Sequence, residues 1–322
     1  MYEFRSSNAS HELSTVSVIV CTKNRPTQLV NCLRSIVSTD WPCRELLVVD
    51  SSVSSIAKKN EILAKSLGAR YLHESRSGLS YARNRGMVEG TGRFIVFADD
   101  DFIARKRWVL NLVRNMANAN VICCTGRMIS HRQDETSELF ERSLGFDKGQ
   151  KKRLFSRRDI SLSSLFVSVR AIRGRLGGDA PVPWCVGNGY FSLVREAVNT
   201  VGSFDESLGV GTPSRGGEEV DMFYRILKSG RTIVYDPEAV IYHDHRPNYF
   251  TLKTAAYNAG ASERAFASKY FGTDLYCTIF FLGALSLRVL QFIMNAVKQR
   301  RAVSDLELLK LCGFLHVPRN GI

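Results

Sequence analysis

The sequence FIVFADDD, residues 94–101, is the stretch on which the fold prediction rests. It opens with a continuous apolar run, which is typical of a strand buried on both faces in a parallel sheet. Asp99, Asp100 and Asp101 follow with no basic residue among them. Open α/β sheets bind ligands at the carboxyl ends of their strands, and three adjacent carboxylates need a compensating cation. Their oxygens suit Mg²⁺ or Mn²⁺. The alternative is a solvated acidic turn that caps a helix starting near Arg105.

Apolar β-branched runs alternate with helical patterns on both sides of this stretch. Before it, strands are expected at residues 16–21, 45–49 and 70–73, and helices from Pro26 and over residues 56–67. After it, a helix is expected over 108–117 and strands over 121–128, 232–235 and 239–242. Residues 141–175 lack clear periodicity and predict a long loop. This alternation predicts an α/β fold with a doubly wound, mostly parallel sheet flanked by helices.

The net charge of +13 comes from two segments of the chain. Residues 141–175 hold ten Lys and Arg against three acids, and residues 246–322 hold ten against four, which gives +7 and +6 and leaves the rest neutral. This indicates a polyanionic partner or an anionic membrane surface, or simply a solvated face. No nucleic-acid-binding module is visible, so no nucleic-acid partner is expected.

Cysteine usage and the first residues predict the compartment. The eight cysteines form no CxxC pair and several lie in apolar patterns, which favours reduced core thiols. Residues 1–15 form a polar tail without an apolar run, so no signal peptide is expected. A cytoplasmic protein is predicted.

Further polar groups follow other predicted strands. The turn SGLSYARNRG, residues 77–86, opens a helix with Arg83 and Arg85, which predicts a diphosphate site or, alternatively, solvated arginines. Glu218, Glu219 and Asp221 begin another helix after a glycine-rich loop, where capping accounts for one acid but hardly for three.

Two histidines end the last predicted strand. His243 and His245 flank an aspartate there. Two interpretations of these histidines have equal weight: one binds a metal or contacts a phosphate, or both are ordinary packed or exposed side chains.

Residues 275–297 are strongly apolar but are interrupted by Arg288 and Gln291. The uninterrupted part is too short to span a bilayer, which takes about 20 residues. Lys298, Arg300 and Arg301 follow at once, which is typical of an interfacial helix on an anionic membrane. Docking on the catalytic domain or in a dimer is the competing interpretation.

Taken together, these motifs resemble a family 2 type glycosyltransferase with the GT-A fold. The resemblance covers about residues 16–246, and its force lies in the joint order and spacing of the motifs. They are VSVIVCTKNRP, LLVVDSS, SGLSYARNRG, FADDD, GNGYF, GGEEVDMFYRI and YDPEAVIYHDHR.

The resemblance implies roles for individual residues of this sequence. Donor-binding residues would be Thr22, Arg25 and Asp50 at the nucleotide, Arg83 and Asn84 along the diphosphate, and Asp99 with Asp100 near the ribose and metal. Asp101, Asp99 and His243 would hold Mn²⁺ or Mg²⁺, with His245 as the alternate to His243. Glu219, beside Glu218, would be the general base, although the family pattern has Asp at that position.

The resemblance also implies the reaction. It is metal-dependent, inverting transfer of a sugar from a nucleoside-diphosphate sugar donor to a hydroxyl of a glycan or lipid-linked acceptor, at the inner face of the cell membrane. The expected organisation is a tail (1–15), a GT-A domain (16–246, with a nucleotide-binding half 16–101 and an acceptor half 102–246) and a basic, amphipathic helical region (247–322). A non-catalytic nucleotide-sugar binding subunit and a sugar-phosphate nucleotidyltransferase are the alternatives.

Overall fold

The structure, a computed structural model, describes residues 16–41, 44–162, 182–243, 248–297 and 301–316. The strands are β1 (Val16–Thr22), β2 (Arg44–Asp50), β3 (Arg70–His73), β4 (Phe94–Asp99), β5 (Phe102–Ala104), β6 (Val121–Ser130), β7 (Arg153–Phe155), β8 (Phe191–Val194) and β9 (Thr232–His243). The helices are α2 (Pro26–Val37), α3 (Ser54–Ser66), α4 (Leu79–Glu89), α5 (Trp108–Val113), α6 (Glu135–Leu144), α8 (Ala197–Val201), α9 (Glu218–Lys228), α10 (Tyr249–Tyr270), α11 (Leu275–Val297) and α12 (Arg301–Leu315), with 3₁₀ turns η1 (Arg114–Ala117) and η2 (Arg157–Ile160).

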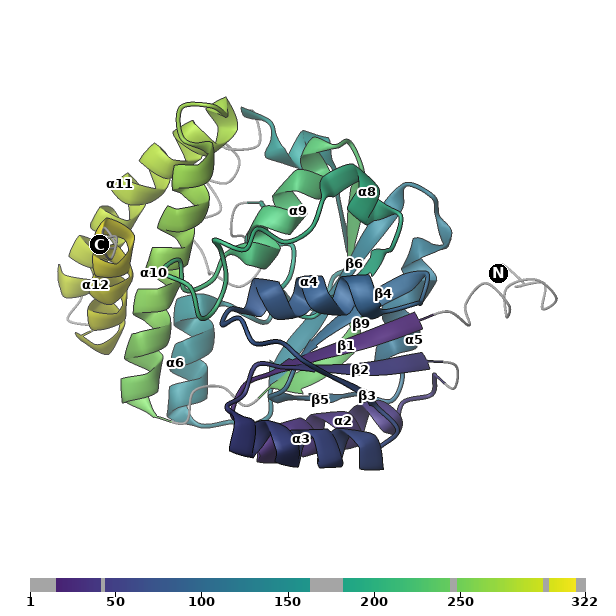
Figure 1. The fold of residues 1–322 in the computed structure, drawn as a ribbon. Coiled ribbons are helices and arrows are strands. Elements are labelled where there is room, and N and C mark those ends of the chain that lie inside the picture. The colour runs from purple at the N-terminus through teal and green to yellow at the C-terminus, as the bar shows by residue number, and fades with distance from the viewer. Residues whose placement is uncertain (1–15, 42–43, 163–181, 244–247, 298–300, 317–322) are drawn as a thin grey trace.

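One twisted sheet runs through the α/β body (Figure 1). Its strand order is β3-β2-β1-β4-β8-β6-β9-β5, and β7 pairs with β9. The strands β3, β2, β1 and β4 are parallel, as are β6 and β9, while β8 joins these two groups through antiparallel pairs. The predicted doubly wound α/β fold is therefore confirmed, with β5, β7 and β8 as antiparallel additions.

The central strands are buried on both faces because their alternate side chains enter two separate cores. Val18 and Val20 of β1 pack on the side of α2 and α5, whereas Ile19 and Cys21 pack on the side of α4 and α9. The strand β4 divides in the same way. Helices must therefore cover both faces, and the apolar runs in the sequence have no polar alternation.

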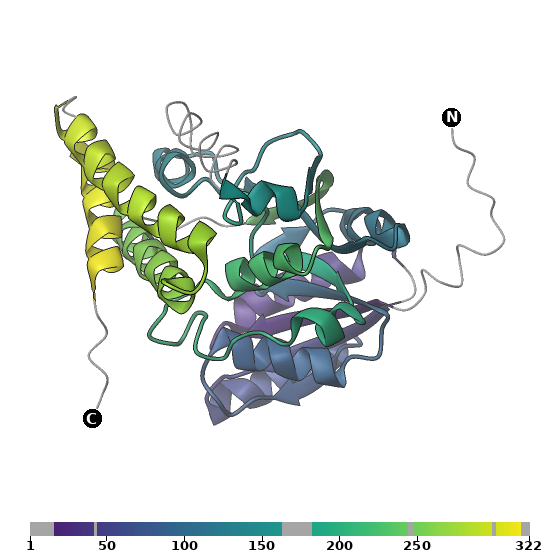
Figure 2. The ribbon, with the colours of Figure 1, turned by 90° about the horizontal axis from the view of Figure 1, so that it is seen from above.

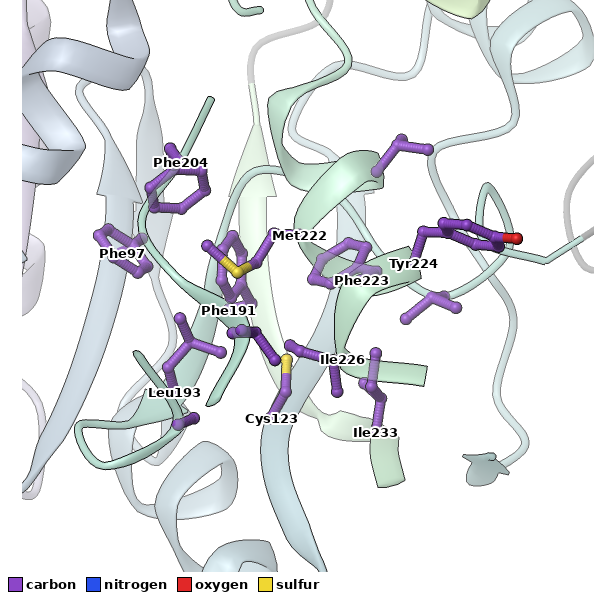
Figure 3. Packing of buried hydrophobic residues seen from close by; sticks show 14 of the residues in the cluster. Phe97, Cys123, Phe191, Leu193, Phe204, Met222, Phe223, Tyr224, Ile226 and Ile233 are labelled. Carbon is purple, nitrogen blue, oxygen red and sulfur yellow. The ribbon is translucent and has the colours of Figure 1, made fainter. Parts of the chain in front are cut away.

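Aromatic rings fill the space between the sheet and α9 (Figure 3). The ring centroids of Phe97 and Phe191 lie 5.0 Å apart, and those of Phe191 and Phe223 also lie 5.0 Å apart. Phe204 closes the group at 5.3 Å from Phe97. This packing ties the strand that carries the aspartates to the helix that carries Glu218 and Glu219.

The last three helices form a layer at one side of the α/β body (Figures 1 and 2). α10 and α12 lie in close contact: a Cβ on Gly260 would lie 1.9 Å from the Lys310 carbonyl oxygen, and one on Gly313 would lie 2.0 Å from that of Tyr257. Only glycine fits at these two crossings. The predicted helix over 275–297 is confirmed as α11. Among the described helices, none combines the length and apolar character needed to cross a membrane.

Three local predictions are corrected. Residues 232–235 and 239–242 belong to one strand, β9, whose pairing with β6 continues past a register shift. The first described part of 141–175 is not a loop throughout: α6 ends there, β7 adds to the sheet and η2 follows. Residues 163–175 of that segment lie outside the described residues. Finally, β5 follows the aspartates and α5 starts at Trp108, so the aspartates do not cap a helix.

Candidate active site

The ends of three parallel strands bring the first group of candidate residues together. Thr22 at the end of β1 pairs in register with Asp50 at the end of β2. On the other side of β1, Cys21 pairs with Asp99 at the end of β4. The aspartate-rich turn therefore starts at the carboxyl edge of the sheet, where α/β folds bind ligands.

Asp100 is held by the turn after β1. Thr22 Oγ1 donates to Asp100 Oδ2 at 2.6 Å, and Arg25 Nη1 donates to Asp100 Oδ1 at 3.1 Å. Burial and the charge of Asp101 raise the pKa of Asp100 to about 6, against these two partners. Asp100 is only 4% exposed, so its contacts are made within the protein.

The side chains of Asp101 and Asp99 are partly exposed. Arg25 Nη1 lies 2.9 Å from Asp101 Oδ2, and His243 Nε2 lies 3.5 Å from Asp101 Oδ1. The Asp99 side chain is 39% exposed, yet the protein around it raises its pKa, and Arg83 opposes that shift. Two carboxylates beside an imidazole are donors that fit a divalent cation.

The same donors do not form a complete metal site by themselves. No cluster of three or more His, Cys, Asp or Glu side chains suited to a metal is present in the part of the chain that the structure describes. A divalent ion here would take its remaining ligands from a bound phosphate or from water, as Mg²⁺ usually does. The alternate ligand His245 lies outside the described residues.

Arg83 joins the aspartate turn to the start of α9. Its guanidinium is 1% exposed and donates from Nη1 to Glu218 Oε1 at 2.7 Å and from Nη2 to Asp99 Oδ1 at 3.3 Å. Nη2 also donates to the carbonyl oxygen of Gly189 at 3.0 Å. These contacts form a continuous bridge, Asp99–Arg83–Glu218, between β4 and α9.

The arginines of the predicted diphosphate site at the start of α4 have partners within the protein, so this site stays a prediction. The guanidinium of Arg83 pairs with Asp99 and Glu218. Arg85 pairs with Glu89, one turn along the same helix, at 3.0 Å. The backbone N–H of Leu79, in the first turn of α4, donates to the carbonyl oxygen of Val210 at 2.9 Å. The loop before α9 thus engages one of the backbone N–H groups at this helix start.

Two other predicted donor-binding residues are engaged within the protein. Asn84 exchanges hydrogen bonds with the backbone of Phe204, at 3.0 Å and 2.8 Å. Asp50 is 0% exposed and accepts hydrogen bonds from Ser52, Asn60 and Tyr71. Contact of Asp50 with a nucleotide base stays a prediction, and it requires one of these partners to be exchanged.

Glu218 and Glu219 begin α9 directly after Gly217. Glu218 is 2% exposed and is paired with Arg83, while Glu219 is half-buried beside it. Burial, and then repulsion by Glu218, raise the pKa of Glu219 well above its ordinary value, and Arg83 opposes this. A carboxyl with raised pKa is a better proton acceptor, which suits a general base.

The third acid of this helix has a different role. Asp221 is 0% exposed and pairs with Arg225 at 2.8 Å and with Lys269 of α10 at 2.7 Å, and it accepts a hydrogen bond from Tyr270. Lys269 also pairs with Asp205 at 2.8 Å. Asp221 thus ties α9 to α10, and its contacts account for the third acid at the start of this helix.

Gly189, in the GNGYF motif, lies against the bridge. A Cβ at this position would lie 2.8 Å from Arg83 Nη2 and 2.9 Å from Asp99 Oδ2. The absence of a side chain therefore makes room for the bridge and not for a ligand directly. The GNGYF motif marks this position in the sequence, but only the fold shows that Arg83 and Asp99 lie against it.

Other proteins resemble this chain in sequence. Residues 17–173 match the sequence model described as glycosyl transferase family 2. The pre-mycofactocin glycosyltransferase of Mycobacterium tuberculosis is 25% identical over 238 residues, which cover 72% of this chain and 43% of that protein. The succinoglycan biosynthesis protein ExoM of Rhizobium meliloti is 25% identical over 293 residues, covering 86% of this chain and 83% of ExoM. The chain thus spans less than half the length of the first relative.

Solved structures show the same fold. The mannosyltransferase PcManGT of Pyrobaculum calidifontis, in complex with GDP-Man and Mn²⁺, superposes with a TM-score of 0.59 over 93% of this chain and 85% of its own. The two sequences are 15% identical, so this likeness concerns the fold alone. It confirms the fold class expected from the motifs.

Proposed function

We propose that this chain, a family 2 type glycosyltransferase with the GT-A fold, transfers a sugar from a nucleoside-diphosphate sugar to an acceptor hydroxyl with inversion. The bridge Asp99–Arg83–Glu218 carries this proposal. It sets the donor-side carboxylates of β4 and the acid pair of α9 on either side of one buried guanidinium. A transferase needs these two groups together, because the leaving diphosphate and the attacking hydroxyl meet at one carbon.

Glu219 is the proposed general base. Glu218 is paired with Arg83 at 2.7 Å, and burial together with repulsion by Glu218 raises the pKa of Glu219. Glu219 would take the proton of the acceptor hydroxyl while the hydroxyl oxygen attacks the anomeric carbon from the face opposite the diphosphate. The bond to the diphosphate oxygen breaks as the new bond forms, so no covalent enzyme intermediate is needed.

The donor would lie along the carboxyl edge of β1, β2 and β4. Thr22, Arg25, Asp50, Asp99 and Asp100 are the proposed donor-binding residues, and Asp99, Asp101 and His243 the proposed holders of Mn²⁺ or Mg²⁺. A bound divalent ion would neutralise the charge that develops on the departing diphosphate. PcManGT binds Mn²⁺ with its donor, which supports a divalent cofactor here. Arg83 would act through Asp99 and Glu218.

The acceptor is proposed to be a growing glycan or a lipid-linked sugar at an anionic membrane surface, on the cytoplasmic side. The proposed division is a nucleotide-binding half (16–101), an acceptor half (102–246) and a helical region (247–322). ExoM carries succinoglycan biosynthesis in its name, which supports an acceptor of the polysaccharide class.

The test combines binding and turnover. A panel of nucleotide sugars is screened by thermal unfolding with and without Mn²⁺, and the donor that stabilises the protein only with metal is used for hydrolysis and transfer assays. Glu219→Gln is expected to lower turnover at least about 100-fold while leaving that stabilisation intact. Glu61→Gln, on the outer surface of α3, is the matched control and keeps normal turnover. Normal turnover in Glu219→Gln with intact donor binding refutes the assignment.

A further inference from the structure

The outer face of α11 is apolar and exposed. Six large apolar side chains along it are between 43% and 77% exposed. At 100° per residue, all six lie within about 80° of one another around the helix axis and extend over about 33 Å. We call them the α11 stripe; they are Leu275, Ile279, Leu282, Leu290, Ile293 and Val297.

The other side of the same helix already packs on the protein. Phe280 stacks on Trp184 with ring centroids 4.5 Å apart, and Phe281 stacks on Phe314 of α12 at 4.9 Å. Cys277 is 1% exposed. A helix that is apolar all round has both faces covered in its working state, so the stripe requires a cover of its own.

The charges in and directly after the sequence of α11 indicate what covers the stripe. Residues 275–297 contain no Asp or Glu, and Lys298, Arg300 and Arg301 follow in the sequence. A second α11 would offer these cations no acid, whereas an anionic lipid surface supplies both an apolar layer and negative head groups. The helix does not meet the requirement for crossing the bilayer, so it would lie along the surface.

We infer that the α11 stripe inserts into the head-group region of an anionic membrane, with α11 parallel to the surface. This specifies the membrane partner of the proposed function down to the residues that touch lipid. It does not depend on sugar transfer, because docking needs neither donor nor acceptor. Failure of the proposed reaction and failure of this docking are therefore separate results.

The experiment is flotation of the full chain with two kinds of vesicle, phosphatidylcholine alone and phosphatidylcholine with phosphatidylglycerol. The stripe variant carries Ile279→Gln, Leu282→Gln and Ile293→Gln. The matched control carries Ile62→Gln, Val88→Gln and Leu154→Gln, which are 63%, 80% and 63% exposed on the α/β body. Thermal unfolding and light scattering report the folding and the oligomeric state of each protein.

The wild-type chain and the control are expected to float with the anionic vesicles and far less with phosphatidylcholine alone. The stripe variant should partition at least about tenfold more weakly, because three apolar side chains lose their burial in lipid. The inference is overturned if the wild-type chain floats with neither vesicle or if the folded stripe variant floats equally well. A change from dimer to monomer in the stripe variant, with unchanged flotation, would instead assign the stripe to a second copy.

Discussion

Arg83 and Glu218 form an ion pair of 2.7 Å in which both side chains are almost completely buried, at 1% and 3% exposure. The two residues are 135 positions apart in the chain. Two charges withdrawn from water in this way stabilise a fold only when each keeps its partner. The pair therefore makes the proposed catalytic acids of α9 dependent on a cation supplied by α4.

Replacing Arg83 by Met is expected to destabilise the protein by about 3–5 kcal/mol, because Glu218 is left as a buried, unpaired charge. The measurement is the free energy of unfolding in urea. Arg85→Met is the control: Arg85 is 46% exposed in its pair with Glu89, and the loss should stay below about 1 kcal/mol.

A double variant separates the charge effect from lost packing. Adding Glu218→Gln to Arg83→Met removes the stranded charge and should recover part of the stability. A double variant less stable than Arg83→Met alone would contradict the buried-pair interpretation.

Gly189→Ala is expected to lower turnover by about tenfold or more, because the new methyl group displaces Asp99 or Arg83 from the bridge. Steady-state kinetics with the preferred donor measure the effect. Gly283→Ala serves as the control, since nothing lies within 4 Å of its Cβ and alanine favours a helix interior. If the two variants keep equal activity, Gly189 does not shape the site.

The contact between Asp205 and Lys269 predicts that the protein loses stability at acid pH. Although burial opposes it, hydrogen bonds from Lys269 and Ser207 lower the pKa of Asp205 from 3.8 to about 2. A carboxyl whose pKa is lower in the folded than in the unfolded chain stabilises the fold when the pH is above its unfolded-state pKa. This stabilisation is lost as the pH falls toward its folded-state pKa. Allowing for its 28% exposure, the contribution is about 1–2 kcal/mol.

Urea unfolding at about pH 6 and about pH 3 tests this prediction. The wild-type chain should lose about 1 kcal/mol more between these conditions than Asp205→Asn, whose amide does not titrate. Equal losses in both proteins would show that the contact with Lys269 does not contribute.

The raised pKa of Glu219 predicts the pH dependence of turnover. Protonated Glu219 cannot accept the acceptor's proton, so kcat should fall as the pH drops through a pKa well above 4.5, the ordinary value for this carboxyl. Profiles from about pH 5 to about pH 9 with saturating substrates measure the midpoint. An acid limb near 4.5 would contradict the burial and repulsion found at Glu219.

Local pattern predicted the elements but not their long-range partners. The strand over 70–73 and the helix over 275–297 have the bounds that the sequence predicts. The antiparallel insertion of β8 between β4 and β6 was not foreseen, because strand neighbours far apart in sequence leave no periodic signal. Two predicted strands also merged into β9, as a register shift there resembles a turn.

The site was predicted as a set of residue types, while its internal contacts were not. Arg83 looked like an open anion ligand, yet it shares the buried face of α4 with Ala82, Gly86 and Met87. Helical spacing alone would have indicated that burial. Which acids it meets depends on how α4 and α9 pack over the sheet, and this cannot be read from either helix.

The close crossing of α10 and α12 at Gly260 and Gly313 bears on which acceptors the proposed site can reach. Backbone touches backbone there, and Lys269 ties α10 to the first turns of α9 through Asp221. If the stripe lies on a lipid surface as inferred, these contacts would hold Glu219, the proposed base, at a fixed distance from the head groups. Acceptor hydroxyls would then have to be presented at that distance for proton transfer.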